Sequence, residues 1–205
     1  MKTHPSLATC MFVLVAMLLL SACGAAPTIR DSKRLDNTAA RTERLSFIYR
    51  HSEMKTVSSY GTGSAWDGET GYPDFGKFLV SQAPTVFQSY GVRITTSRLV
   101  EGKVPIDIKA EMETGETVAD HVLLLYANSG QVSANRHATR ISFVFNAQLV
   151  NIQSKKMVWK ASIDTSTWSG RDFIQKNFEK TTYDDKYAKQ LLQTVADKMK
   201  EDGVI

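Results

Sequence analysis

The fold is decided by a stretch that begins with Val122-Leu-Leu-Leu-Tyr126 and ends with Met157-Val-Trp-Lys-Ala-Ser-Ile163. The first segment is an uninterrupted apolar run, which is typical of a central strand. Apolar residues then alternate with more polar ones over residues 141–149 and again over residues 157–163, with the period of a strand. The polar connection 151–156 joins these two segments as a hairpin. The sequence therefore predicts an antiparallel meander of three strands.

Outside this meander, the sequence predicts two further strands and two helices. Leu45-Ser-Phe-Ile-Tyr49 and Val92-Arg-Ile-Thr-Thr96 alternate as strands do. One helix is predicted to begin at Pro73 and another to occupy residues 184–202, both with apolar residues at helical spacing. Residues 100–119 fit a strand or a short helix, and both alternatives stay open. We predict an α+β fold with a mixed, mainly antiparallel sheet of about five strands and two helices packed on one face.

An apolar run without charges occupies residues 10–20 near the start of the chain, and small residues follow it. Eleven helical residues span about 16 Å, about half of a bilayer core of about 30 Å, which suits a signal peptide better than a transmembrane helix. The segment Leu20-Ser21-Ala22-Cys23-Gly24 is similar to the lipobox of bacterial lipoproteins. This resemblance implies cleavage before Cys23, a diacylglycerol on its thiol and an acyl chain on its new amine. The alternative is an ordinary secretory leader in which Cys23 is incidental.

The same resemblance divides the chain into three parts. Residues 1–22 are predicted to be a lipoprotein signal peptide, residues 23–44 a lipidated N-terminus with a flexible tether, and residues 45–205 a single periplasmic α/β domain. Residues 24–44 are read as a tether because they are polar and small, with little apolar surface to bury. Gly24, rather than aspartate, follows the cysteine. The resemblance therefore implies anchoring in the bacterial outer membrane, with the domain facing the periplasm.

The charge and the cysteine content argue against nucleic-acid binding and against an internal disulfide. The formal net charge is +4, from 25 basic and 21 acidic residues, and no run of Lys or Arg of the kind that nucleic-acid-binding proteins usually show is present. The two cysteines are Cys10 and Cys23, of which Cys10 lies in the predicted leader. A processed chain would hold one cysteine and could form no internal disulfide.

The meander also carries a second resemblance. The segment Phe143-Val-Phe-Asn-Ala-Gln-Leu-Val-Asn-Ile-Gln-Ser-Lys-Lys-Met-Val-Trp159 resembles a strand, turn and tryptophan-bearing strand of small envelope lipoprotein domains. These include the N-terminal domain of TolB and the curli-secretion and penicillin-binding-protein-activator lipoproteins. The resemblance covers about residues 120–200. It implies an architecture and not an activity.

Residues 51–72 form a long segment rich in Gly and Ser, read as a functional or mobile loop. The loop carries three aromatic residues that are candidates for contact with a partner, or else cover the sheet edge: Tyr60, Trp66 and Tyr72. Its Gly61-Thr-Gly-Ser64 stretch invites a phosphate-loop interpretation, but no helix follows directly. Ser58, Ser59 and Ser64 lie near His51 and Asp67 in sequence, without the elbow motif of a serine hydrolase.

No catalytic, cofactor or metal site is predicted, and no cofactor is expected. His51, His121 and His137 lack the spacing of metal ligands, so they are read as surface or strand-end residues. Three acidic residues on a polar turn are read as solvated charge: Glu111, Glu113 and Glu116. The aromatic residues of the meander are read as core, namely Phe143, Phe145 and Trp159.

These observations favour a binding protein over an enzyme. We expect an outer-membrane lipoprotein that contacts the membrane through its lipid anchor and binds an envelope protein in assembly, transport or cell-wall maintenance. It is not expected to bind nucleic acid. Two alternatives stay open: an envelope hydrolase that acts on cell wall or lipid, and a structural subunit of an oligomeric envelope assembly.

Overall fold

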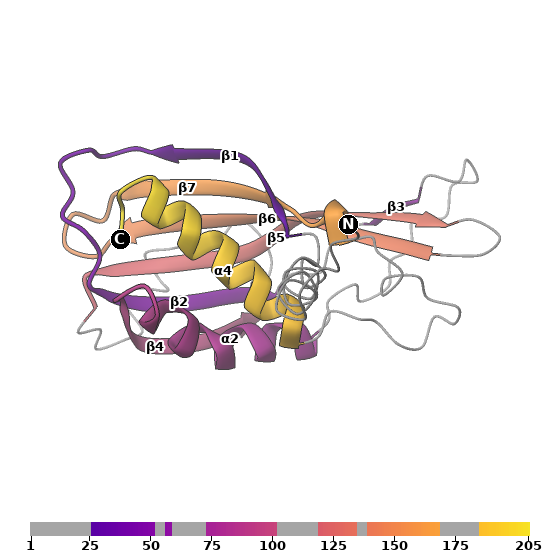
Figure 1. Cartoon of the computed structure of the whole chain (residues 1–205), viewed down its shortest axis with the longest axis horizontal. Coiled ribbons are helices and arrows are strands. Elements are labelled where there is room, and N and C mark those ends of the chain that lie inside the picture. The colour runs from indigo at the N-terminus through magenta and orange to yellow at the C-terminus, as the bar shows by residue number, and fades with distance from the viewer. Residues whose placement is uncertain (1–25, 52–55, 59–72, 102–118, 135–138, 169–184) are drawn as a thin grey trace, which may run out of the picture.

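The computed structural model describes residues 26–51, 56–58, 73–101, 119–134, 139–168 and 185–205. These residues form one mixed sheet, two α-helices and a short 3-10 helix (Figure 1). The strands are β1 (Thr28–Arg34), β2 (Arg44–His51), β3 (Thr56–Ser58), β4 (Arg93–Glu101), β5 (His121–Ala134), β6 (Thr139–Asn151) and β7 (Met157–Asp164). The helices are α2 (Pro73–Gln88), η1 (Ser166–Trp168) and α4 (Asp185–Glu201).

The predicted meander is confirmed. Strands β5, β6 and β7 are neighbours and pair antiparallel. The hairpin between β6 and β7 closes where the Asn151 N–H donates to the Lys156 carbonyl at 2.9 Å. Lys155 takes the left-handed conformation in this turn, with φ of 55°. The side-chain oxygen of Asn151 accepts the Ser154 N–H at 2.8 Å, so the same residue that ends the strand also holds the turn.

The strand order is β1-β7-β6-β5-β2-β4, with β3 paired to the far part of β5. The sheet is mixed, as predicted, but it has seven strands rather than about five. Parallel pairing is also commoner than predicted, because β2 runs parallel to both β4 and β5, and β3 runs parallel to β5. Apolar alternation shows which face a strand buries and not its direction. The direction follows from the crossover through α2, which lets β4 start at the same end as β2.

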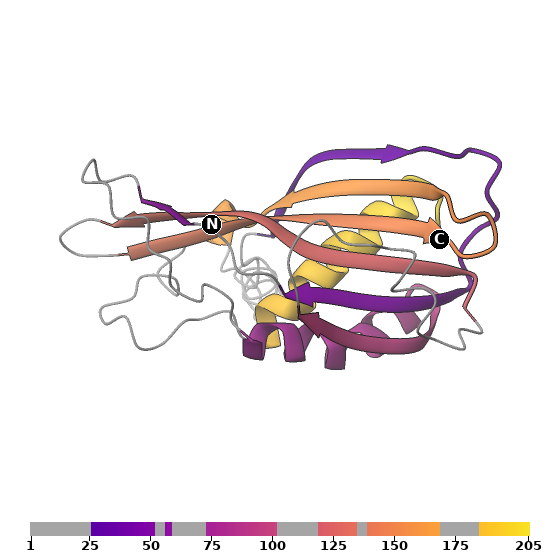
Figure 2. The same cartoon turned by 180° about the vertical axis from the view of Figure 1, so that it is seen from behind.

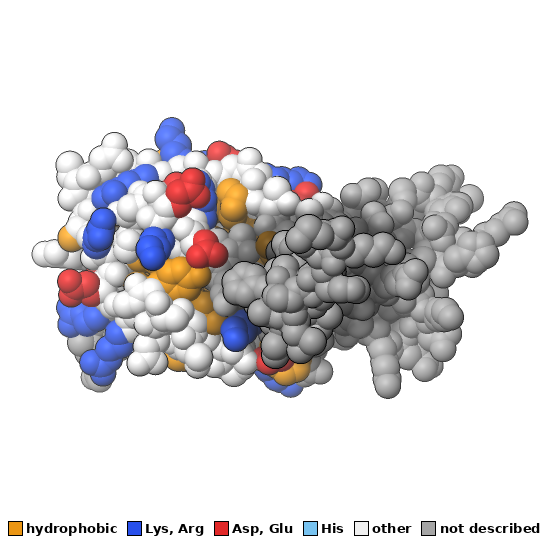
Figure 3. Space-filling model, viewed as in Figure 1, with side chains coloured by type: hydrophobic (Ala, Val, Ile, Leu, Met, Phe, Trp, Pro, Cys, Tyr) orange, Lys and Arg blue, Asp and Glu red, His pale blue; other side chains and the backbone are white. Residues whose placement is uncertain are grey.

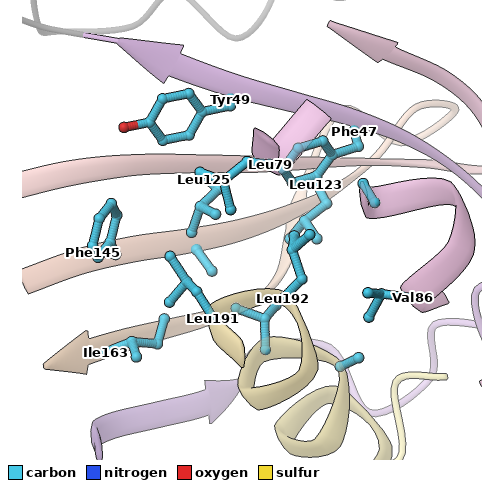
Figure 4. Close-up of a cluster of buried hydrophobic side chains, with 14 of the residues drawn as sticks. Phe47, Tyr49, Leu79, Val86, Leu123, Leu125, Phe145, Ile163, Leu191 and Leu192 are labelled. Atoms are coloured by element: carbon cyan, nitrogen blue, oxygen red, sulfur yellow. The ribbon is translucent and has the colours of Figure 1, made fainter. Parts of the chain in front are cut away.

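Both helices pack on one face of the sheet, as predicted, and the main core lies between them and the strands (Figures 1 and 4). Leu45, Phe47 and Tyr49 of β2 enter this core because they are two residues apart on one face. The apolar stripe of α4 that the sequence predicts is buried: Tyr187, Leu191, Leu192, Val195 and Met199. The predicted core residues Phe143, Phe145 and Trp159 are each at most 3% exposed.

The prediction of a flexible tether over residues 23–44 is wrong for its described part. Thr28–Arg34 forms the edge strand β1, in register with β7 from Thr28 opposite Asp164 to Arg34 opposite Trp159. Residues 35–43 are also tied to the body, where the Leu35 N–H donates to the Val158 carbonyl and the Thr42 N–H to the Val204 carbonyl. An edge strand has one neighbour and can be polar on its exposed parts, so its composition resembles that of a linker.

Strands β5 and β6 continue beyond the rest of the sheet as a two-stranded arm, defined here as residues 129–134 and 139–143. Strand β2 pairs with β5 no further than Tyr126, and β7 pairs with β6 only from Val144. A bulge between Ala127 and Ser129 marks the base of the arm. Strand β3 pairs with β5 along this arm, within the segment 51–72 that was predicted as a loop. Figures 1 and 2 show the arm projecting from one end of the molecule.

Candidate functional site

The second face of the sheet, opposite α2 and α4, carries a band of polar side chains. In β6, Phe145, Ala147 and Leu149 enter the core, so alternation places Asn146 and Gln148 on this second face. Figure 2 views the sheet from this side, with the helices behind it. Tyr126 of β5 lies opposite Asn146, and Lys160 of β7 lies opposite Gln148. We name these four residues, Tyr126, Asn146, Gln148 and Lys160, the polar band.

Hydrogen bonds fix the centre of the polar band. The Gln148 Nε2 group donates to the Tyr126 hydroxyl oxygen at 3.0 Å, and the Asn146 Nδ2 group approaches the same oxygen at 3.4 Å. All three side chains are half-buried. Because the phenol oxygen is occupied as an acceptor, the hydroxyl proton is left as a donor. Within the described parts of the chain no acceptor for that proton is found. An acceptor group of a ligand could take it.

Two lysines stand side by side at the border of this band. Lys33 of β1 is the register partner of Lys160 of β7, and both side chains are exposed. Neither forms an ion pair with a residue that the structure describes. Like charges directly opposite each other on paired strands are destabilising, so this pair does not serve the fold. It suits an anionic or acceptor-rich partner.

The helix side of the molecule carries charges of both signs. Lys, Arg, Asp and Glu side chains are interspersed there, with apolar side chains between them (Figure 3). The second face has an apolar component too, because Ile48, Val122 and Leu124 form a small buried cluster next to Tyr126. These three side chains are each at most 2% exposed, so the apolar patch beside the polar band is buried and not open to a partner.

His121 is at the centre of a buried network at the other end of β5. Its Nδ1 lies 3.3 Å from the Thr42 hydroxyl, and its Nε2 lies 3.2 Å from the Asn151 amide nitrogen. The Asn151 amide oxygen already accepts the Ser154 N–H, so its NH₂ group must donate to Nε2. The His121 proton therefore resides on Nδ1 and is donated to Thr42. His121 is a strand-end residue, as predicted, but only 2% of it is exposed.

This network bears on hydrolase chemistry. Thr42, His121 and Asn151 have the order of a hydroxyl nucleophile, a base and an orienting amide. A base must accept the hydroxyl proton, yet Nδ1 carries a proton and donates it. The arrangement instead fastens the 35–43 segment and the β6–β7 turn to the start of β5. Burial lowers the pKa of His121, and the nearby Asp120 carboxylate opposes that shift in part.

The structure places few of the other residues singled out from the sequence. His51 ends β2 and is half-buried. The partner-binding candidates Tyr60, Trp66 and Tyr72 lie outside the described residues, as do Cys23, residues 61–64, His137 and the three glutamates. Within the described residues no group of three His, Cys, Asp or Glu side chains could hold a metal ion. No described helix is long and apolar enough to cross a bilayer.

Sequence reasoning missed the polar band. Its signal in the sequence is the pair Asn146 and Gln148, each between two core residues of one strand. Alternation alone assigns both amides to the non-core face. What the sequence leaves out is the register, which brings Tyr126 and Lys160 beside them.

The sequence matches no protein-family model and no curated protein. Among solved structures, the chain is similar to PelC from the dodecamer of Paraburkholderia phytofirmans, with 15% identity over 82% of this chain and 94% of that one and a TM-score of 0.39. Lipoprotein GNA1162 from Neisseria meningitidis matches with 11% identity over 76% and 99% and a TM-score of 0.36. The LpoB C-terminal domain from Salmonella enterica matches with 16% identity over 62% and 86% and a TM-score of 0.22. With TM-scores this low, the likenesses identify no family and carry nothing about function.

Proposed function

We propose that this protein is a lipid-anchored lipoprotein of the bacterial outer membrane whose periplasm-facing domain binds an envelope protein and catalyses no reaction. The observation that carries the proposal is the segment Leu20-Ser21-Ala22-Cys23, placed directly after an apolar run of signal-peptide length. Two or three acyl chains on Cys23 exceed the threshold for stable anchoring. An anchor confines the domain to the surface where its partner is found and so raises the effective concentration of that partner.

The polar band supports the binding part of the proposal. Lys160 offers a cation that has no ion-pair partner among the described residues, and the Tyr126 hydroxyl offers a proton on a strand in the middle of the sheet. A partner that presents carboxylate and carbonyl oxygens would meet both. Because the Tyr126, Asn146 and Gln148 side chains are already ordered by their contacts, binding would cost little side-chain entropy.

Replacing Cys23 by serine tests the anchor. The Cys23→Ser variant is expected to incorporate no radiolabelled palmitate and to leave the membrane fraction. Cys10→Ser is the matched control, since Cys10 lies in the predicted leader, and it should keep both properties. Unchanged membrane fractionation of Cys23→Ser without incorporated fatty acid would overturn the proposal.

Site-specific photo-crosslinking in cells tests the binding surface. A photoreactive residue at Ser162, the register neighbour of Asn146, is expected to capture one envelope protein, whereas the same residue at Thr85 on α2 should not. Lys160→Glu should reduce the yield about tenfold, since losing one charge contact is worth roughly 1.4 kcal/mol. Lys189→Glu, an exposed lysine of α4, is the charge-matched control. Equal capture from Ser162 and Thr85 would contradict the assignment of this face.

A further inference from the structure

One side-chain amide connects the buried network around His121 to the exposed turn between β6 and β7. The Asn151 side chain donates from Nδ2 to His121 Nε2 at 3.2 Å, and its Oδ1 accepts the Ser154 N–H at 2.8 Å. Nδ2 and Oδ1 are the two ends of one planar group, and a half-turn about the Cβ–Cγ bond exchanges them. Only one of the two ends can therefore face His121 at a time.

The protonation state of His121 determines which end of the amide fits. Neutral His121 donates from Nδ1 to the Thr42 hydroxyl, so its Nε2 is an acceptor and is satisfied by the Asn151 NH₂ group. A protonated histidine is a donor on both ring nitrogens. Its Nε2–H would face the hydrogens of that NH₂ group, whereas the Asn151 oxygen could accept it in a charge-assisted hydrogen bond. Only 2% of His121 is exposed, so water has little access as a substitute acceptor.

The charges near the ring oppose each other in part. The Asp120 carboxylate, next to His121 in the chain, favours the charged ring, while burial has the larger effect and lowers the pKa of His121. Asp120 is itself paired with Arg44 of β2, and the Glu43 carboxylate also acts on Arg44. Protonation of the ring therefore takes place below the usual pH range of a histidine, with one carboxylate beside it.

The other elements that contact the ring bring uncharged groups to it. The segment 35–43 contributes the Thr42 hydroxyl, and β6 contributes the Asn151 amide. The two lysines of the turn, Lys155 and Lys156, are exposed, and Lys156 acts on Asp36. Among the described groups at hydrogen-bond distance from Nε2, the Asn151 amide is thus the one that can answer a change of protonation.

We propose that His121 and Asn151 form a proton-operated latch on the turn between β6 and β7. When His121 takes up a proton, the Asn151 amide turns over and its oxygen accepts the Nε2–H. The Ser154 N–H then loses its acceptor, because the NH₂ group of Asn151 takes the place of the oxygen. Ser154 is exposed, so the surface of the turn gains a hydrogen-bond donor in acid. This inference goes beyond the proposed function and does not depend on it.

NMR spectroscopy of the isotope-labelled full chain, in micelles of a non-ionic detergent, tests the latch. The ring nitrogens of His121 report its protonation, and amide hydrogen exchange reports the hydrogen bond of Ser154. As His121 becomes protonated, exchange at Ser154, corrected for its intrinsic pH dependence, is expected to accelerate about fivefold or more, since a hydrogen bond of ordinary net strength is lost. The Ile152 N–H, which donates to the Asp120 carbonyl at 3.0 Å, is the internal control and should keep its protection.

Two variants separate the rotation of the amide from the charge of the ring. Asn151→Asp places an acceptor at both ends of the side chain, so one carboxylate can hold the Ser154 N–H and the protonated ring together. In this variant Ser154 should stay protected throughout the titration, and the pKa of His121 should be higher than in the unaltered protein. His121→Gln has no titrating ring and should also keep Ser154 protected in acid.

Several outcomes would overturn the latch. One is a Ser154 N–H that stays protected in the unaltered protein after His121 is protonated. Another is an equal loss of protection in Asn151→Asp, where no amide can turn over. Parallel loss of protection at Ile152 would show that the whole turn opens, and unfolding of the protein before His121 is protonated would show that the folded state holds no such latch.

Discussion

At the scale of single residues, His121 makes stability depend on pH. Its pKa in the folded protein is lowered from 6.5 by burial, so the unfolded chain takes up a proton first. Protonation would also give Nε2 a hydrogen that faces the Asn151 NH₂ group. The contribution of His121 is therefore complete above about pH 6.5 and declines as the pH falls below it, by at most about 1.4 kcal/mol per pH unit.

Urea unfolding of the protein without residues 1–22, the predicted leader, at about pH 7.5 and about pH 5.5, measures this effect. The unaltered protein should be less stable at the lower pH, and His121→Gln should lose most of that difference. His51→Gln, at the half-buried end of β2, is the control and should keep it. An identical pH dependence in His121→Gln would show that other groups cause the loss.

The indole of Trp159 gives a second residue-scale prediction. Trp159 is fully buried, and its Nε1–H donates to the Asp202 carboxylate at 2.8 Å, beside Lys198 at 3.1 Å. Asp202→Ala would leave the indole N–H without an acceptor and is expected to cost about 1–3 kcal/mol in the free energy of unfolding. Glu201→Ala, which removes an exposed partner of the same lysine, should cost less than about 0.5 kcal/mol. Thermal and urea denaturation of the two variants provide the comparison.

The place of a residue in the fold could be predicted from the sequence where the pattern that reveals it lies within one strand. Phe143, Phe145 and Trp159 were predicted as core from alternation alone, and they are core. The contact of Gln148 with Tyr126 could not be predicted, because it needs the register between two strands that are far apart in the chain. Likewise, His121 could be placed at a strand end but not recognised as buried, since Thr42 reaches it from a segment read as tether.

At the scale of elements, the strands and helices with strong patterns were predictable, and the weak ones were not. Regular apolar spacing made four parts of the fold predictable from the sequence, namely the meander, β2, α2 and α4. Strand β1 carries one, Ile29, and needs β7 to form its ladder. Its existence is a tertiary effect, which no local pattern encodes.

Packing of α2 on the sheet gives an element-scale prediction. A Cβ at Gly76 would lie 2.9 Å from the Tyr49 ring carbons and 2.9 Å from a Leu99 methyl group. Real Cβ atoms do not approach so closely, so Gly76→Ala should push α2 away from β2 and β4, at a cost of about 1–3 kcal/mol despite the better helix propensity of alanine. Thr85→Ala, on the exposed side of α2, should be within about 0.5 kcal/mol of the unaltered protein. Chemical denaturation distinguishes the two, and a neutral Gly76→Ala would show that the helix can shift freely.

At the scale of the whole molecule, the edge of the sheet that lies nearest in sequence to the proposed anchor is β1, which begins five residues after Cys23. The polar band lies on β5, β6 and β7, within three strands of the β1 edge. If Cys23 carries lipid, as the proposed function states, a partner that binds the band would sit close to the membrane surface. We then expect the partner captured from Ser162 to be held at that membrane itself.

The pairing of β1 with β7 also determines how late in folding the sheet is completed. Thr28 meets Asp164, 136 positions later in the chain, so one border of the sheet forms only after nearly the whole polypeptide is available. Contacts of such long sequence separation are entropically late and slow folding toward the millisecond-to-second range. A nascent chain thus cannot pair β1, its first described strand, until β7 has been synthesised. If Cys23 is acylated, as the proposed function states, we expect that modification to precede the pairing of β1.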